Sequence, residues 1–390
     1  MHHRQRYLIL VAAVLMQTGL GATYSWSIFA DALSRQLTLN KATAQLPFTA
    51  FYIAFPATMI FSGILLRRLG IRGCAILGGL IFGGGWMFAS LGGRHFAYTI
   101  LGVGLLGGIG VGLAYVVPIS VGMQWFPRHK GLVTGLIVAG FGAGAAVVSK
   151  VAESLMRSGE TTALDVLLML GAVFATVIAL TGSLMRLPQT PPVQAGISLE
   201  PEEEPRWRYI VFGGSFRLLY LAMFTGLAAG FTIIANLKQL CPNIDMAAGA
   251  VAVGVLAIAN AAGRVSWGFA FDRLFSTAAI RYNLLAQAAV LLAAPLLSRT
   301  PTGLYVLAAL AGFNYGGVLV LYASATAQNW GARRVGRIYG WLFSANIPAS
   351  LTPVAAAAVY DRANTFTPAL LTLAALLLVA GLMSRLIQIR

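Results

Sequence analysis

The chain has 390 residues, of which 58% are hydrophobic and only 10% are charged, and its mean hydropathy is +0.79. Soluble domains of this length are far less apolar, so the composition excludes a soluble protein and predicts a membrane protein with many spans. The net charge of +16 does not indicate nucleic-acid binding, because the basic residues lie in short segments between apolar runs and not on one face.

Apolar runs of about twenty residues, the length that crosses the hydrocarbon core, recur along the chain. Twelve can be placed, near 7–31, 43–66, 72–91, 96–125, 130–156, 163–186, 216–236, 246–271, 278–298, 302–328, 335–359 and 366–387. The predicted fold class is therefore an all-α membrane protein with twelve transmembrane helices. The first run lacks the small-residue cleavage site of a signal peptide, so we expect it to be a permanent span.

The distribution of Lys and Arg predicts the orientation of the spans. An even number of spans places both termini on one side, and the segments on that side carry 18 of the 27 basic residues, against 8 on the opposite side and Arg264 inside a span. The positive-inside rule then predicts that both termini are cytoplasmic. Because no organellar targeting segment precedes the first span, the expected location is a bacterial cytoplasmic membrane.

A polar stretch divides the spans six and six. Residues 187–215 combine prolines with the acidic run Glu202 to Glu204, and such a composition cannot form a packed core, so we expect a cytoplasmic linker. The expected halves are residues 1–186 and 216–390.

An internal repeat supports this division. A shift of 205 residues aligns Arg68 with Arg273 and Trp125 with Trp330. Two parallel six-span halves are an architecture in which a substrate site lies near the midplane between the halves and opens alternately to each side.

Arg264 is the one cation inside the apolar run from Gly249 to Arg273. A lone arginine in a span costs at least a few kcal/mol, so it normally faces a cavity or a partner. Asn260 lies one turn earlier on the same helix face. The forked guanidinium matches the two oxygens of a carboxylate, which predicts a site for a small organic anion. Alternatively, Arg264 pairs with carbonyls or extends towards the cytoplasmic face, and Asn260 makes a bond between helices.

Three segments resemble a known family. They are YSWSIF at 24–29, GGIGVGLAYVVPISVGMQWFPRHKGLVTGLIVAGFGAG at 107–144 and NAAGRVSWGFAFDR at 260–273. They resemble the oxalate/formate antiporter family of the major facilitator superfamily, which is related to the monocarboxylate transporters. The resemblance implies that Arg264 binds the substrate carboxylate with Asn260 beside it, and that Tyr115 and Tyr315 reach the same cavity.

Two loops resemble the superfamily signature of glycine, three residues, Asp-Arg, then glycine and basic residues. The first begins at Gly63, but Arg67 stands where the aspartate is usual, and the second contains an intact Asp272-Arg273 pair. The resemblance implies close helix approach at the glycines and cytoplasmic latches formed by the charges. The implied gating residues are Gly63, Arg68, Arg72, Gly268, Asp272 and Arg273.

Two departures from the family narrow the expected substrate. Oxalate transporters of the family carry a lysine in the eleventh span, whereas residues 335–359 hold none and Asn346 is the most polar interior residue there. A single cation favours a monoanion. Proton-coupled monocarboxylate transporters typically carry an aspartate where this chain has Asn260, so the sequence gives only weak support for proton coupling through a protein carboxylate. A proton or a counter-anion can still accompany the substrate.

The predicted function is secondary transport of a small monocarboxylate of the lactate, pyruvate or formate type, by symport or exchange. The alternatives are an oxalate or dicarboxylate exchanger, which should show a second cation in the cavity, and a drug or sugar carrier of the same fold. The residues expected to line the cavity are Tyr24, Tyr115, Phe141, Asn260, Arg264, Tyr315, Leu319, Phe343 and Asn346. Alternatively, the tyrosines are packing or interfacial aromatics, and Asn346 marks a bend beside Pro348.

An enzyme would need a nucleophile with its base, or a metal cluster, inside the spans, and the sequence shows neither. We therefore expect no cofactor and no metal. The expected partners are the small carboxylate and the lipid bilayer, without nucleic acid, and the fold suggests a monomer.

Overall fold

The computed structural model describes residues 2–157, 161–188, 207–237, 239–241, 246–274 and 276–387. The described residues are helical almost throughout, and no strand occurs among them. They form two compact units. Unit 1 comprises Met1–Phe126 and Leu136–Pro188, and unit 2 comprises Pro127–Gly135 and Gln189–Arg390. Most of the expected linker, residues 189–206, lies outside the described residues.

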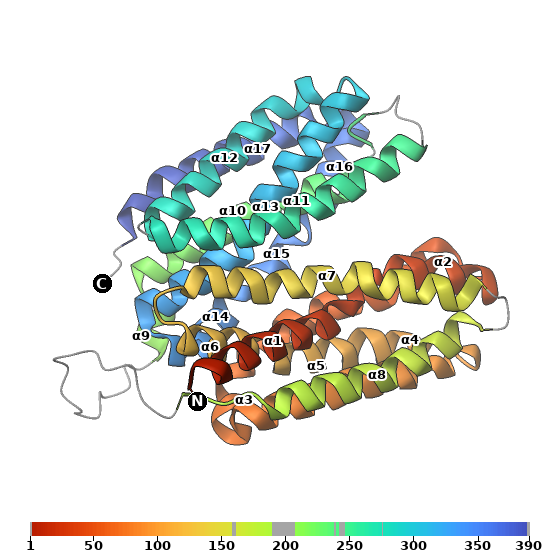
Figure 1. Ribbon diagram of the computed structural model, residues 1–390. Helices are drawn as coiled ribbons and strands as arrows, with labels where there is room; N and C mark the ends of the chain where they lie inside the picture. The colour runs from red at the N-terminus through yellow and green to blue at the C-terminus, as the bar shows by residue number, and fades with distance from the viewer. Residues whose placement is uncertain are drawn as a thin grey trace, which may run out of the picture. The chain divides into compact units, whose positions relative to one another are not determined.

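Unit 1 consists of long helices that run back and forth (Figure 1). Its elements are α1 (His2–Leu20), η1 (Gly21–Ser25), α2 (Trp26–Gln36), α3 (Lys41–Ala89), η2 (Ser90–Gly93), α4 (Ala97–Thr99), η3 (Ile100–Leu106), α5 (Gly107–Ala114), α6 (Val116–Trp125), α7 (Lys130–Arg157) and α8 (Ala163–Ser183). Of these, η3 is π-helical, and the first residues of α7 cluster with unit 2.

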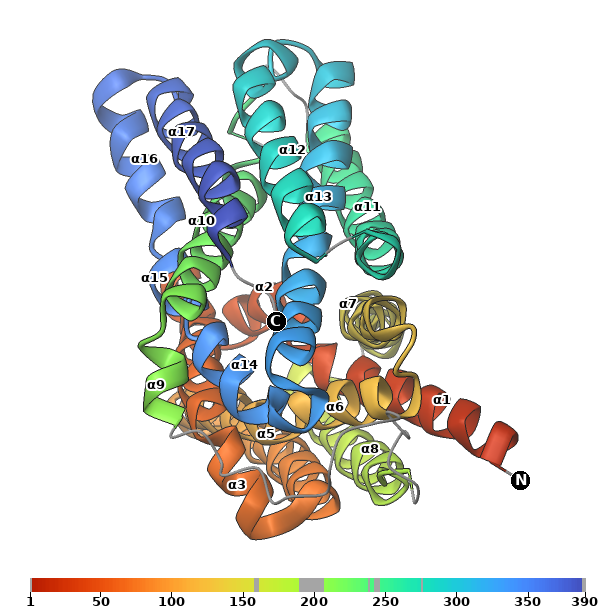
Figure 2. The same ribbon diagram turned by 90° about the vertical axis from the view of Figure 1, so that its left-hand side faces the viewer.

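Unit 2 is likewise built from long helices (Figure 2). Its elements are α9 (Trp207–Val211), α10 (Gly214–Asn236), α11 (Met246–Arg273), α12 (Ser276–Leu297), α13 (Pro301–Trp330), η4 (Ala332–Arg334), α14 (Val335–Phe343), α15 (Asn346–Ala349), α16 (Thr352–Ala363), α17 (Thr367–Met383) and η5 (Ser384–Leu386). The short helix α9 falls within the stretch that the sequence predicts to be linker.

Eleven helical stretches of the described chain are long and apolar enough to cross a membrane. One of them, Thr43–Gly93, has 51 residues and covers two of the predicted spans. It is interrupted at Gly70, whose φ of 70° and ψ of 172° are not helical. With this interruption, the structure is consistent with the twelve predicted spans. Large apolar side chains such as Ile258, 75% exposed, and Val354, 69% exposed, are suited to contact lipid.

Local signals in the sequence account for several helix starts. The side chain of Asn40 accepts a hydrogen bond from the Thr43 N–H and so caps α3. Thr162 and Asp165 form a reciprocal capping box at the start of α8. Thr300 caps α13, and Pro301 occupies its first turn, where a missing N–H costs nothing.

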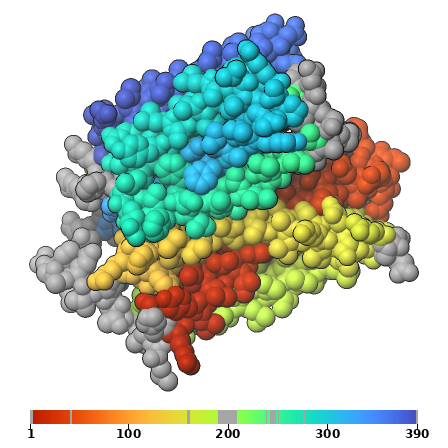
Figure 3. All heavy atoms as spheres, turned by 45° about the horizontal axis from the view of Figure 1, so that its top comes forward, coloured from red at the N-terminus to blue at the C-terminus, as the bar shows by residue number. Residues whose placement is uncertain are grey.

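Small residues let the helices of unit 1 approach closely. Gly108 of α5 faces α3, and a Cβ added there would lie 2.6 Å from the Ala54 Cβ. Gly140 of α7 packs in the same way against the Val14 carbonyl of α1. Figure 3 shows the surfaces of α1 and α7 directly against each other. These glycines therefore permit close packing of the helices, as small residues do in other membrane proteins.

Candidate functional site

Arg264 lies in α11 of unit 2 and is only 3% exposed. Its Nε donates a hydrogen bond of 2.9 Å to the Oδ1 of Asn260, one turn earlier. This bond uses one of the five guanidinium donors and orients the plane of the fork. Among the described residues, Arg264 is the only charged side chain that is buried. Arg264 and Asn260, which the sequence places on one helix face, are therefore in direct contact.

The backbone of α13 packs against the turn of α11 that carries this pair, and the two helices lie side by side (Figure 2). A Cβ added at Gly316 would collide with the Asn260 carbonyl oxygen, and one at Gly263 would collide with the Phe313 carbonyl oxygen. Both glycines are therefore needed for the close approach of the two backbones. This packing fixes the position of the Arg264 main chain relative to α13.

Three further predicted residues of unit 2 lie on α13 and α14. Tyr315 is 6% exposed, and its ring centroid lies 5.8 Å from that of Phe231. The carbonyl oxygen of Leu319 accepts a hydrogen bond of 3.1 Å from the Tyr339 hydroxyl. Phe343 packs edge to face on the same tyrosine, with 5.7 Å between ring centroids. Tyr339 thus joins α14 to α13 beside two of the predicted residues.

Asn346 lies at the junction of α14 and α15 and is 5% exposed. Its Nδ2 donates a hydrogen bond of 2.8 Å to the Phe343 carbonyl oxygen. The amide therefore satisfies a main-chain acceptor where the helix is interrupted, which is the role expected for a residue at a bend. Its contact with substrate stays a prediction.

The predicted residues of unit 1 form one aromatic cluster. Phe141 of α7 makes edge-to-face contacts with Tyr24 and Tyr115, at centroid distances of 5.2 and 5.3 Å. Phe55 of α3 makes a similar contact of 5.3 Å with Tyr115. Tyr115 and Phe141 are buried, and Tyr24 is partly exposed. Edge-to-face geometry stabilises such clusters beyond the area that they bury.

Gln17 of α1 is a buried polar residue that the sequence analysis did not select. It is fully buried, and its Nε2 donates a hydrogen bond of 3.1 Å to the Tyr115 carbonyl oxygen. Tyr115 lies between the end of α5 and the start of α6, so this bond stabilises the chain at the junction of the two helices. A glutamine inside the first apolar run was a signal that could have identified it.

Unit 2 contains a buried amide network that was also missed. Gln287 donates to the Asn283 Oδ1, and Asn283 donates to the Asn314 carbonyl oxygen, each at 2.9 Å. All three side chains are buried. The network joins α12 to α13 immediately before Tyr315, and amides inside two apolar runs were its sequence signal.

Asp272, one of the predicted latch residues, binds the start of α7. Its carboxylate oxygens accept hydrogen bonds of 2.8 Å each from the N–H groups of Gly131 and Leu132, which belong to unit 2. A carboxylate is stabilised there by two charge-assisted bonds and by the positive end of the helix dipole. The exposed Arg273 places its guanidinium 4.7 Å from the centre of the Phe269 ring.

The corresponding loop of unit 1 makes different contacts. Gly63 is buried and Arg68 is exposed. The Arg72 Nε donates to the Met185 carbonyl oxygen at 3.3 Å, near the end of α8, where a cation complements the free carbonyls. Trp125 donates to the neighbouring Arg186 carbonyl oxygen at 2.7 Å. A gating role for either loop stays a prediction.

No group of three or more His, Cys, Asp or Glu residues suited to a metal ion occurs in the part of the chain that the structure describes. Cys74 and Cys241 are both buried free thiols.

Two curated relatives match most of the chain. The oxalate:formate antiporter of Oxalobacter formigenes is 25% identical over 356 residues, which cover 89% of this chain and 82% of that protein. The apicoplast pyruvate carrier 1 of Toxoplasma gondii is 28% identical over 392 aligned positions, which cover 84% of this chain and 71% of that protein. Both relatives are named as carriers and not as enzymes.

The fold has close counterparts among solved structures. The crystal structure of the transporter FucP in the outward conformation superposes with a TM-score of 0.75 at 14% identity, covering 98% of this chain and 99% of that chain. At this identity the likeness concerns the fold alone. In addition, the profile of the Major Facilitator Superfamily matches residues 10–353. The chain therefore belongs to the Major Facilitator Superfamily and is a multi-pass membrane transporter.

Proposed function

We propose that this transporter carries a small monocarboxylate of the lactate, pyruvate or formate type, and that Arg264 binds the carboxylate. The observation that carries the proposal is the burial of Arg264 in α11, with its Nε held by Asn260. A guanidinium oriented in this way presents paired donors to a planar carboxylate. Tyr315 is proposed as a neighbour of Arg264 in unit 2. Tyr24, Tyr115 and Phe141 of unit 1 are proposed as further substrate-binding residues.

The charge of the site favours a monoanion. Arg264 is the only buried charged side chain among the described residues, so one negative charge suffices to neutralise it. A dianion such as oxalate would bring a second charge into a medium where an unpaired charge is costly. The similarity to a protein named as an oxalate:formate antiporter keeps oxalate exchange as the second candidate.

Uptake into proteoliposomes tests the proposal with labelled lactate, formate and oxalate. Arg264→Ala should lower monocarboxylate uptake at least about thirtyfold, because truncating a buried charged group that pairs with its ligand costs about 2–5 kcal/mol. Arg264→Lys should restore little, because an ammonium is a point charge and cannot form the fork. The matched control is Arg362→Ala, which removes an exposed arginine of unit 2 and should transport normally.

The assay also separates the alternatives. Stimulation by an inward proton gradient indicates symport, and stimulation by internal anion indicates exchange. Uptake of oxalate in preference to lactate would select the second candidate. Normal transport by a monodisperse Arg264→Ala protein would refute the assignment of Arg264 and, with it, the substrate class.

A further inference from the structure

Arginine residues gather at one end of unit 1, where α1 begins, α3 is interrupted at Gly70 and α8 ends (Figure 1). The described acidic residues of this unit lie at its opposite end, near the ends of α2 and α7 and the start of α8. No described carboxylate of unit 1 therefore neutralises the arginine end. Its arginines are Arg4, Arg6, Arg67, Arg68, Arg72 and Arg186, and the acidic residues of the opposite end are Asp31, Glu153 and Asp165.

Hydrogen bonds hold two of these arginines at the end of α8. The Arg72 Nε donates to the Met185 carbonyl oxygen at 3.3 Å. The next residue, Arg186, donates from its Nε to the Gln5 side-chain oxygen of α1 at 3.1 Å, with the Gln5 amide oriented so that its oxygen faces the guanidinium. Both arginine side chains are exposed. Because a guanidinium has five N–H donors, each keeps donors for a ligand while its position is fixed by a neighbouring helix.

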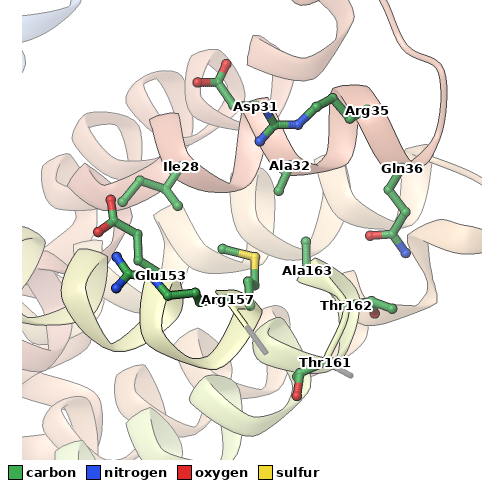
Figure 4. A pocket seen from close by; sticks show the side chains of 11 residues that line it. Ile28, Asp31, Ala32, Arg35, Gln36, Glu153, Arg157, Thr161, Thr162 and Ala163 are labelled. Carbon is green, nitrogen blue, oxygen red and sulfur yellow. The ribbon is translucent and has the colours of Figure 1, made fainter. Parts of the chain in front are cut away.

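The opposite end of unit 1 shows a different charge pattern. There Asp31 and Arg35 of α2, and Glu153 and Arg157 of α7, line a pocket of about 780 Å³ (Figure 4). Each of these arginines has a carboxylate four residues earlier on its own helix, so its charge is balanced locally. The positive-inside rule accounts for an excess of basic residues on one side of a membrane, and it does not require their side chains to be held in place. The anchored and unbalanced arginines of the other end therefore call for a ligand of negative charge.

Exposed apolar residues lead from the arginine end along two helices. On α1 they are Leu8, Val11 and Leu15, which share one helix face with Arg4. On α8 they are Leu180 and Leu184, shortly before Arg186. The two helices pack against each other, since a Cβ added at Gly19 of α1 would lie 3.0 Å from the Ile178 Cγ1 of α8. Charged groups at one end of an apolar surface match a lipid, whose headgroup and chains are arranged in the same order.

We propose that the arginine end of unit 1 binds an anionic phospholipid, with Arg72 and Arg186 as ligands of the headgroup phosphate and the apolar residues of α1 and α8 against the acyl chains. The planar guanidinium group forms paired hydrogen bonds with phosphate oxygens. A zwitterionic headgroup would bring its ammonium group among arginines where unit 1 offers no described carboxylate, so a lipid of net negative charge is favoured. The site does not depend on the proposed transport substrate.

The experiment is native mass spectrometry of the full-length protein in detergent, titrated with phosphatidylglycerol or with phosphatidylcholine of the same acyl chains. We expect phosphatidylglycerol to bind at least about fivefold more tightly, because its headgroup carries a net negative charge. Glycerol 3-phosphate, added at the concentration of the lipid, should not displace it, because it lacks the chains that contact α1 and α8. Equal binding of the two lipids would overturn the proposal, and so would displacement by glycerol 3-phosphate, which would indicate a site for soluble phosphate.

Variants test the two arginines. Arg72→Gln with Arg186→Gln should weaken binding of phosphatidylglycerol about tenfold, since it removes two basic residues from the headgroup site. Arg72→Lys with Arg186→Lys keeps the charge without the fork and should weaken it less, about threefold. The matched control is Arg35→Gln with Arg157→Gln, which removes the same charge from exposed residues at the opposite end and should leave binding unchanged.

Equal weakening in the control would show that the lipid responds to the net charge of the protein alone, and unchanged binding in Arg72→Gln with Arg186→Gln would exclude these ligands. Either result would overturn the proposal. The comparison of the two lipids uses only the wild-type protein, so it remains decisive if a variant fails to fold.

Discussion

At the scale of single residues, the contact between Arg264 and Asn260 combines a buried cation with a neutral acceptor. The Asn260 Oδ1 accepts from the Arg264 Nε at 2.9 Å and adds no negative charge. A carboxylate at this position would orient the guanidinium equally well, but it would also neutralise it. The amide therefore orients the guanidinium of Arg264 without adding a charge beside it.

We expect transport by an Asn260→Asp variant to depend on pH. At neutral pH the new carboxylate should compete with the substrate for Arg264, so uptake should fall well below that of the wild type. Acidification should restore uptake relative to the wild type, because a protonated carboxyl group is neutral and no longer competes. The measurement is the ratio of variant to wild-type initial rates between pH 5 and pH 8.

Asn260→Leu is the control for this prediction. It removes the acceptor without adding a titratable group, so it should raise KM by a similar factor at every pH. If the Asn260→Asp ratio did not change with pH, Asn260 would not control the charge presented by Arg264.

Asp272 supports a second prediction at this scale. Its two hydrogen bonds to the Gly131 and Leu132 N–H groups should make Asp272→Ala less stable by about 2 kcal/mol or more, because bonds to charged groups contribute more than neutral ones. Asp272→Asn keeps one acceptor oxygen and should be intermediate. Thermal unfolding in detergent measures the difference.

The matched control for Asp272 is Asp361→Asn, which neutralises an exposed carboxylate of α16 and should change the melting temperature little. A melting temperature of Asp272→Ala equal to that of the wild type would mean that the carboxylate does not stabilise the start of α7.

At the scale of elements, two kinds of glycine shape the helices. Gly263 and Gly316 permit backbone contact between α11 and α13, so their role is steric. Gly70 interrupts α3 with φ of 70°, so its role is conformational. A Cβ added at Gly70 would meet no atom within 4 Å. A side chain at this position would therefore be disfavoured by backbone strain and not by steric crowding.

Gly70→Ala should therefore lower the free energy of unfolding by about 1–3 kcal/mol through backbone strain alone, because L side chains rarely adopt its conformation. Gly84→Ala is a matched control in the same element, where the glycine is helical and an added Cβ is also unhindered. This control should be neutral or stabilising by up to about 1 kcal/mol, since alanine is the better helix former. Equal stability of the two variants would show that the Gly70 conformation is not required.

At the scale of the whole molecule, the chain is a multi-pass transporter, and its orientation is a prediction. Eleven apolar helical stretches, one of them divided at Gly70, correspond to twelve spans. The excess of Lys and Arg on the side of the termini predicts that both termini are cytoplasmic. The division into halves at residues 1–186 and 216–390 likewise stays a prediction.

Reporter fusions in a bacterial host test this orientation. A fluorescent protein fused to the C-terminus should fluoresce, and alkaline phosphatase fused after Arg299 should be active, because that segment is expected outside. Alkaline phosphatase fused after Arg334 is the control and should be inactive. The opposite pattern of activities would show that the orientation is reversed.

The helical membrane class, the number of spans, the superfamily and the prominence of Arg264 could all be predicted from the amino-acid sequence. These follow from local properties, because twenty apolar residues can cross a bilayer and a charge within them is costly wherever it lies. The contact of Arg264 with Asn260 was equally predictable, since both lie on one helix.

The contacts between residues far apart in the sequence became known from the folded structure. It brought Gln17 to Tyr115, joined Gln287 and Asn283 to α13, and set the Asp272 carboxylate on the first turn of α7. It also gathered the charges of α2 and α7 around one pocket. Such contacts depend on how helices far apart in sequence pack, and a nearly uniform apolar pattern carries little information about that packing.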